Sequence, residues 1–196
     1  MATTSALLDN ELRRDGARPF ITSYDGDGNR VELSVATTAN WVAKAAGYLE
    51  DELGIEPGEP VTVEPALHWL TAVVLLAGWA VGADVVFESS RDPVAVDVPL
   101  DPMGAGFSRM VAAYPDRYVP SAPSGEAAPG EVPIGARLLT TLPLDESGIT
   151  LGLLGPLAAG GSVVYAPPTA DLARIAAAER VTHTAGADIG GLPRLG

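Results

Sequence analysis

Two adjacent carboxylates, Asp145 and Glu146, stand at the start of a predicted helix in the stretch LLTTLPLDESGITLGLLGPLAAG, residues 138–160. A pair of acids at such a position can select a cationic ligand or exchange protons with a substrate. The same residues can instead cap the helix, with Asp145 accepting first-turn amides and Glu146 interacting favourably with the helix dipole. Capping is the simpler interpretation, and the sequence leaves both open.

Other residues suited to chemistry are sparse. The chain has no cysteine and two histidines, His68 and His183, far apart in sequence, which argues against a Cys nucleophile and a His-rich metal site. His68 lies in an apolar segment and is expected to be a packed or interfacial histidine. No G-x-S-x-G elbow accompanies His183, so a hydrolase triad is unsupported. The sequence predicts no catalytic residue and no metal ligand.

The turn DGDGN, residues 25–29, suggests calcium, because Asp25, Asp27 and Asn29 have the first three ligand spacings of an EF-hand loop. Such a loop needs Gly next and a bidentate Glu at its twelfth position. Arg30 and Ala36 occupy those positions instead. A solvated hairpin turn is the better interpretation.

The composition excludes several classes of function. The formal net charge of the 196-residue chain is -13, with 12 Lys plus Arg against 25 Asp plus Glu, so contacts to nucleic-acid phosphates or anionic lipids would lack partners. The apolar stretch at residues 65–83 contains no charged residue but is bracketed by Pro and Gly, and it predicts a buried core helix rather than a membrane span. The N-terminus has no long apolar core typical of a secretory signal, so a cytoplasmic location is expected.

The elements that would position these residues alternate between strand and helix. The pattern predicts a helix at 5–15, a hairpin at 17–34, and a helix beginning near Thr37 or Thr38 and stopping at Gly54. Next come a strand at 59–64, a helix at 66–81, a strand at 83–89, a further strand at 94–98 and a helix at 103–113. After a Pro/Gly-rich segment at 114–136 come strands at 136–143, 162–167 and 181–186, with helices at 145–160 and 169–180, the latter capped by Thr169.

This order predicts an α/β fold of two small lobes with mainly parallel strands covered by helices. The first lobe is expected at residues 1–113, a mobile linker or loop at 114–136, and the second lobe at 137–196.

Four stretches together resemble the N-terminal domain of the adenylate-forming superfamily, which includes acyl-CoA synthetases, luciferases and peptide-synthetase adenylation domains. The stretches are residues 31–63, 69–87, 138–167 and 172–187. Leu33 and Ser34 stand at the leading positions of the first motif, and Pro57 and Gly58 at its Pro-Gly. The resemblance implies a shortened form of that domain.

The same resemblance shows what is missing. These enzymes hold phosphates in a loop like TSGTTGxPKG, whose amides and Lys neutralise the charge. Here the corresponding segment is PSAPSGEAAPGEV, residues 120–132, which has two acids and no lysine. The resemblance makes Ser124, Gly125 and Gly130 candidates for remnants of the loop, together with Pro129.

In the family, a Phe-His pair after the LPL motif lines and gates the acyl pocket. This chain has Asp145 and Glu146 at those positions. These acids and Gly186 are the candidates for a remnant pocket. The chain's only lysine, Lys44, is expected to be a solvated helix charge. The resemblance also places the family's adenine, ribose and C-terminal-domain motifs beyond residue 196, so ATP or AMP binding is expected to be weak and no cofactor is expected.

The leading hypothesis is therefore a catalytically inactive relative that binds a small acyl-like or nucleotide-like ligand or a protein partner, with a homo-oligomer expected. The alternative hypothesis is one part of an acyl-adenylating ligase, with a separate polypeptide supplying the phosphate-binding groups and the C-terminal domain.

Overall fold

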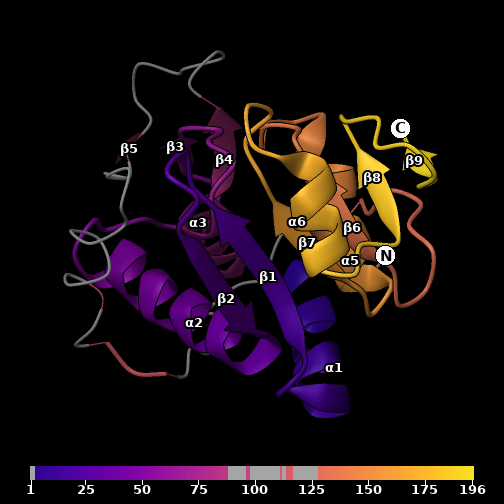
Figure 1. Cartoon of the computed structure of the whole chain (residues 1–196). Helices are drawn as coiled ribbons and strands as arrows, with labels where there is room; N and C mark the ends of the chain where they lie inside the picture. Colours follow the sequence, from indigo (N-terminus) through magenta and orange to yellow (C-terminus); the bar gives the residue numbers. More distant parts are fainter. Residues whose placement is uncertain (1–2, 88–95, 98–110, 112–113, 117–127) are drawn as a thin grey trace.

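The computed structural model describes residues 3–87, 96–97, 111, 114–116 and 128–196 of the chain. These residues form two β-sheets of unequal size with helices packed against them (Figure 1). The larger sheet has six strands in the order β2-β1-β7-β6-β8-β9, and the smaller has three in the order β4-β3-β5. All paired strands are parallel except β1 and β2, which are antiparallel. The α/β fold with mainly parallel strands is confirmed.

The larger sheet takes strands from both sides of residues 114–136. The predicted hairpin forms as β1 and β2, but β1 also pairs in parallel with β7, with Ile21 opposite Val163. The short strand β9 lies in the tail where no element was expected. The strands are β1 Pro19–Tyr24, β2 Arg30–Ser34, β3 Pro60–Val63, β4 Asp84–Phe87, β5 Val96–Asp97, β6 Arg137–Thr140, β7 Ser162–Tyr165, β8 His183–Ala185 and β9 Arg194–Leu195.

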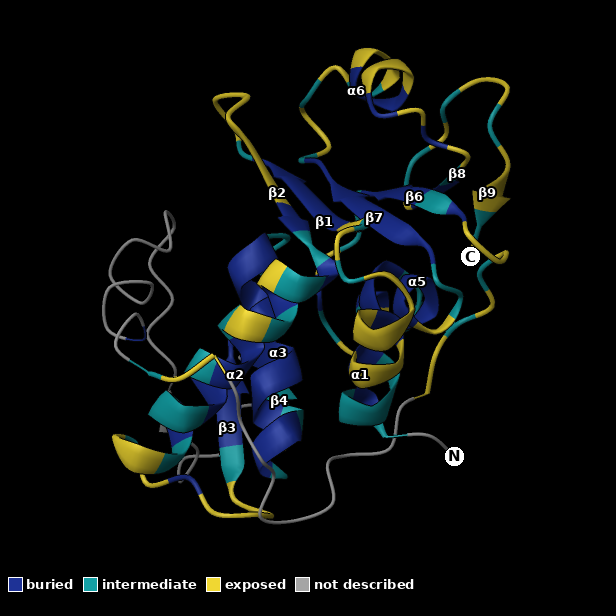
Figure 2. Cartoon of the chain, turned by 90° about the horizontal axis from the view of Figure 1, so that it is seen from below, coloured by how far each residue is buried: buried dark blue, intermediate teal, exposed yellow. Residues whose placement is uncertain are grey.

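Helices cover the larger sheet on both faces, with α6 on one face and α1 and α5 on the other (Figure 2). The strand β7 shows the resulting pattern, because Val163 and Tyr165 belong to one apolar cluster and Val164 to the other. Burial on both faces is why the central strands are continuous apolar runs. The helices are α1 Thr4–Asp15, α2 Val35–Asp51, α3 Trp69–Val81, α5 Gly155–Ala158 and α6 Leu172–Ala178, with a π-helical turn η2 at Thr150–Leu154.

Two predicted helix caps were wrong. Ser34, rather than Thr37 or Thr38, caps α2, because its backbone is extended and its Oγ accepts the Thr37 amide at 3.1 Å. Asp171, rather than Thr169, caps α6 by accepting the Arg174 amide at 3.0 Å. In both cases the cap lies three residues before a first-turn amide that has no backbone acceptor, and its side-chain oxygen accepts that amide.

The apolar segment at 65–83 forms α3, whose 13 residues are all buried except Trp79. It packs against α1, α2 and β1 as well as β3 and β4, which confirms the prediction of a core helix. No helix in the described part of the chain has the length and apolar character to cross a bilayer. The predicted helix at 103–113 falls outside the described residues except for Val111, as do residues 117–127 of the predicted linker.

Candidate functional site

The carboxyl ends of β6 and β7 lie where the chain connections diverge. After β6 the chain enters η2 and α5 on one face of the sheet, whereas after β7 it enters α6 on the opposite face (Figure 2). When neighbouring parallel strands diverge in this way, a crevice opens beyond their carboxyl ends, and open α/β sheets bind ligands there. This edge of the sheet is therefore the first place to look for a site.

A cavity of about 320 Å³ occupies this position, which we call the switch-point cavity. Its walls come from the segments that follow β1, β6 and β7 and from the residues that precede α3. The lining residues are Tyr24, Asp25, Gly26, Leu67, His68, Thr141, Pro143, Pro167 and Pro168.

His68 is the imidazole at this cavity. It is the N-cap of α3, and its Nδ1 accepts the Leu70 amide at 3.2 Å. A ring nitrogen that accepts a hydrogen bond has no proton, so the neutral ring carries its proton on Nε2. The ring centroid also lies 5.5 Å from that of Trp69, with the two planes tilted by 40°. This agrees with the expected packed histidine, to which the structure adds a capping role.

Asp25 is the charged residue of the lining and closes the turn between β1 and β2. Its Oδ1 accepts the amides of Asp27 at 2.9 Å and Asn29 at 2.8 Å, and its Oδ2 accepts Asn29 Nδ2 at 2.7 Å. These bonds, the one from the Asn29 side chain foremost, lower the pKa of Asp25 below its ordinary value. The carboxylate is therefore ionised at neutral pH. No cluster of three or more potential metal-ligating side chains occurs among the residues the structure describes.

Asp145 acts as a cap rather than as part of the cavity lining. Its Oδ1 accepts the amides of Ser147 at 3.0 Å and Gly148 at 2.9 Å and the Ser147 hydroxyl at 2.7 Å. These hydrogen bonds lower the pKa of Asp145 in spite of its partial burial. Glu146 is exposed. The cavity reaches Pro143 but neither acid.

Gly186 follows β8 and lies beside the cavity residue Thr141. Its φ is +76°, and an added Cβ would lie 2.8 Å from both Thr141 Oγ1 and the Leu142 side chain. The Thr141 amide donates to the Ala185 carbonyl at 3.2 Å, which holds the ends of β6 and β8 together. Glycine at position 186 is thus required by the backbone conformation and by this close approach.

The structure shows how the backbone of Gly130 is bonded within the fold. Its amide donates to the Thr150 carbonyl at 2.8 Å, and the Gly155 amide donates to the same oxygen to close the π turn. The Gly130 N–H is therefore already used within the fold. Ser124 and Gly125, the other loop candidates, lie outside the described residues.

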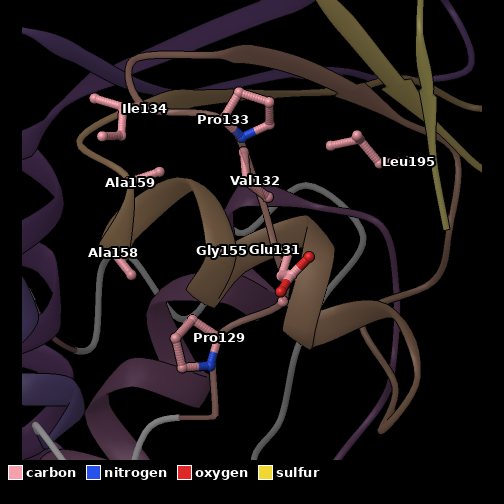
Figure 3. A pocket seen from close by; sticks show the side chains of 10 residues that line it. Pro129, Glu131, Val132, Pro133, Ile134, Gly155, Ala158, Ala159 and Leu195 are labelled. Carbon is pink, nitrogen blue, oxygen red and sulfur yellow. The ribbon is translucent and has the colours of Figure 1, made fainter.

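Gly130 instead lines a groove of about 590 Å³ against α5, which we call the α5 groove (Figure 3). The side chains that line it are apolar apart from Glu131, and Ile134 has 88% of its surface exposed. The groove is lined by Pro129, Gly130, Glu131, Val132, Pro133, Ile134, Gly155, Ala158, Ala159 and Leu195.

Lys44 is not the solvated charge that the sequence suggested. Its Nζ donates to the Tyr114 carbonyl at 2.6 Å and lies 2.9 Å from the Asp116 carboxylate. The Tyr114 ring packs on the same helix, edge-on to Tyr48. The lysine therefore holds residues 114–116 against α2. The sequence pattern could not show this contact, because only folding brings the two segments together.

A second group of charges lies under α6. The buried carboxylate of Glu179 accepts hydrogen bonds from Tyr24 at 2.6 Å, from Arg30 at 2.7 Å and from Arg137. These donors, Arg30 foremost, lower the pKa of Glu179 to about 2. These three donors belong to β1, β2 and β6, so the carboxylate fastens the end of α6 to the sheet.

Sequence reasoning missed most of the cavity lining. Asp25 was considered only as a calcium ligand, and Tyr24, Leu67 and Thr141 were not singled out. Tyr24 and Thr141 end or directly follow parallel strands, and the rule that ligands bind at carboxyl ends could have identified them. That rule needed the pairing of β1 with β7, which the hairpin pattern does not reveal.

Comparison with known proteins addresses the fold first. No family model matches the chain. In structure, the chain is similar to the inhibitor-bound N-terminal domain of FACL13 from Mycobacterium tuberculosis, with a TM-score of 0.77 and 12% identity over 95% of this chain and 63% of that chain. The fold is that of an acyl-CoA synthetase N-terminal domain. The Mycobacterium tuberculosis fatty acyl CoA synthetase is also similar, with a TM-score of 0.74 and 12% identity over 93% of this chain and 49% of that one.

A curated protein supports the likeness in sequence. A protein of Mycobacterium tuberculosis (strain ATCC 25618 / H37Rv), described as a TIGR03089 family protein, is 43% identical over 94 residues. That stretch is 47% of this chain and 39% of the relative. The chain thus spans well under two thirds of the relative's length, and the structural likenesses at 12% identity establish the fold alone.

Proposed function

We propose that this chain is a non-catalytic protein with an adenylate-forming fold that binds a small molecule in the switch-point cavity without activating it. The observation that supports the proposal is the composition of the cavity lining. Its nine residues include no Lys and no Arg, and their one formal charge is that of Asp25. The proposed ligand is a small molecule without a triphosphate.

Electrostatics support the absence of adenylation. A triphosphate held beside a carboxylate requires cations or aimed amides, because like charges in a partly desolvated site repel strongly. In this chain, the Gly130 amide is bonded to Thr150, and Lys44 is paired with Asp116. Arg30 and Arg137 are paired with Glu179 under α6. The net charge of -13 further opposes the approach of a polyanion.

Calorimetric titration of the chain with ATP, with and without magnesium, tests the first half of the proposal. We expect no saturable heat, and no pyrophosphate exchange with any carboxylic acid. Saturable ATP binding or measurable exchange by the chain alone would overturn the proposal.

Blocking the cavity tests the second half. An added Cβ at Gly26 meets no atom within 4 Å and its φ is unstrained, so Gly26→Phe introduces a ring at the cavity without a backbone clash. We expect this variant to abolish the thermal shift given by small ligands. The matched control is Gly190→Phe, which has equally open surroundings and lies outside the lining. Equal ligand shifts in both variants would contradict binding in the cavity.

The second candidate function is a ligase made of two polypeptides. Two observations favour it: the parallel strands β1, β7 and β6 that border the switch-point cavity are formed, and the lining of that cavity contains no Lys or Arg. In this case another chain would supply the Ser/Thr/Gly-rich loop and its lysine. Mixing the chain with a separately expressed polypeptide that contains such a loop would then produce pyrophosphate exchange that neither part shows alone.

Self-association is the partner interaction that the surface favours. The side chains of the α5 groove are apolar apart from Glu131, and Ile134 is exposed (Figure 3). Within the described residues, β9, which contains Leu195, is the edge strand of the larger sheet. Exposed apolar surface beside an open edge is a common feature of interfaces. The proposed occupant is a second copy of this chain.

A further inference from the structure

The switch-point cavity combines apolar walls with one negative charge. Leu67 and the three prolines Pro143, Pro167 and Pro168 supply the apolar surface. The lining contains no Lys or Arg, and His68 Nδ1 accepts the Leu70 amide and therefore carries no proton in this hydrogen bond. The charge that a ligand meets in this cavity is therefore that of Asp25.

The hydrogen bonds of Asp25 come from its own turn and keep its carboxylate ionised. A carboxylate offers about four lone-pair directions. Within the described residues, the Asp27 and Asn29 amides use those of Oδ1, and Asn29 Nδ2 uses one of Oδ2. The Gly28 amide also interacts with this carboxylate, so a ligand would meet the negative charge of Asp25 rather than a vacant acceptor position. The turn also fixes the carboxylate in place, so a ligand would not have to order it.

We propose that the switch-point cavity binds a small primary amine with an apolar body, placing the ammonium group at the Asp25 carboxylate and the carbon skeleton against the prolines and Leu67. This inference rests on the proposed function, because it names the ligand class of the same cavity. It departs from the acyl-like or nucleotide-like ligand expected there, since the lining would repel a carboxylate or phosphate and attract a cation. The negative net charge of the chain also favours the approach of a cation.

The size of the cavity limits the ligand. Ligand pockets in proteins span roughly 300–1,000 Å³. At about 320 Å³ this cavity lies at the lower end of that range. A single ring or a short branched chain is an appropriate body, and the matched probes cyclohexylamine, cyclohexanol and cyclohexanecarboxylate differ in the head group while sharing the ring.

Titration of the full chain with the three probes, followed by NMR or calorimetry at neutral pH, tests the inference. We expect cyclohexylamine to bind about tenfold more tightly than cyclohexanol, because a charge-assisted hydrogen bond is replaced by a neutral one. Cyclohexanecarboxylate should bind most weakly. Raising the salt concentration should weaken amine binding and leave alcohol binding unchanged, because screening acts on the ion pair alone.

Two variants locate the charge responsible. In Asp25→Asn the amine should lose its advantage over the alcohol, while Oδ1 is kept as an acceptor for the turn. Asp27→Asn changes an exposed acid two residues away that is not in the lining, and its binding should match that of the wild type. If Asp25→Asn fails to fold, the salt dependence and the order of the three probes on the wild-type chain decide the question.

The possible failures are distinguishable. Binding of the alcohol or acid as tight as that of the amine, with loss in Gly26→Phe, would overturn the amine preference and leave the proposed cavity function standing. Amine binding that is unchanged in Asp25→Asn would also overturn the inference. Absence of saturable binding by all three probes, together with saturable binding of ATP, would overturn the proposed function itself.

Discussion

The Glu179 carboxylate shows how a single residue can join parts of the chain that are distant in sequence. It lies after α6, yet its donors Tyr24, Arg30 and Arg137 come from the hairpin and from β6. A buried carboxylate is tolerated only when it is paired and hydrogen-bonded. Removing its charge would leave two guanidinium groups without their shared partner.

We therefore predict that Glu179→Gln lowers the free energy of unfolding at neutral pH by on the order of 3 kcal/mol. Because the pKa of Glu179 is depressed from 4.5 to about 2 in the folded state, its contribution is present above pH 4.5 and is lost as the pH falls towards 2. Urea denaturation across this range should show a steep acid loss for the wild type and a flatter profile for the variant. Glu64→Gln, at an exposed position, should keep the wild-type profile.

At the scale of elements, the predicted helix at 145–160 begins with a turn capped by Asp145 and continues through a π turn into α5. The π turn arises where the Thr150 carbonyl accepts both Gly155 and Gly130. The two acids at the start of this segment thus have different surroundings although they are adjacent in sequence.

Replacing each acid by alanine distinguishes capping from ligand selection. Asp145→Ala should destabilise the fold by about 1 kcal/mol because two first-turn amides lose their acceptor. Glu146→Ala should stay within about 0.5 kcal/mol of the wild type, as exposed substitutions usually do. Thermal or urea unfolding measures both. A loss of ligand affinity in Glu146→Ala without loss of stability would contradict the capping interpretation.

The elements could be predicted from sequence where the apolar pattern is long or bounded by Gly and Pro. This applies to the hairpin, to α1 and α3, and to the strands that became β6 and β7. Helix starts were missed where several hydroxyl residues stand close together, as at Ser34, Thr37 and Thr38, since only the folded backbone decides which one is extended. The two-residue strand β9 is too short to show a period.

The candidate site was less predictable than the elements. Gly186 and the pair Asp145–Glu146 were candidates for a remnant pocket by resemblance, yet none of them lines the cavity. Asp25 and His68 reach it from segments far away in sequence. Such a convergence depends on long-range strand pairing, which neither periodicity nor local motifs encode.

For the whole molecule, the question is whether the α5 groove is covered. If a second copy covers it, sedimentation at increasing concentration should show a dimer, and Ile134→Asp should give a monomer because it places a charge on the apolar rim. Val31→Asp is the matched control, at a partly exposed apolar position on the opposite edge strand β2. A wild-type monomer at high concentration, or a dimer lost only in Val31→Asp, would contradict an interface at this groove.

The insertion of β1 between β2 and β7 has a consequence for biosynthesis. The hairpin leaves the ribosome early, but its inner edge pairs with Val163 and its neighbours, which are translated much later. Until then β1 has an unpaired edge and its apolar side chains lack their final cover, a state in which nascent chains aggregate or recruit chaperones. Slower translation after residue 34 would lengthen that exposure, and faster completion of β7 would shorten it.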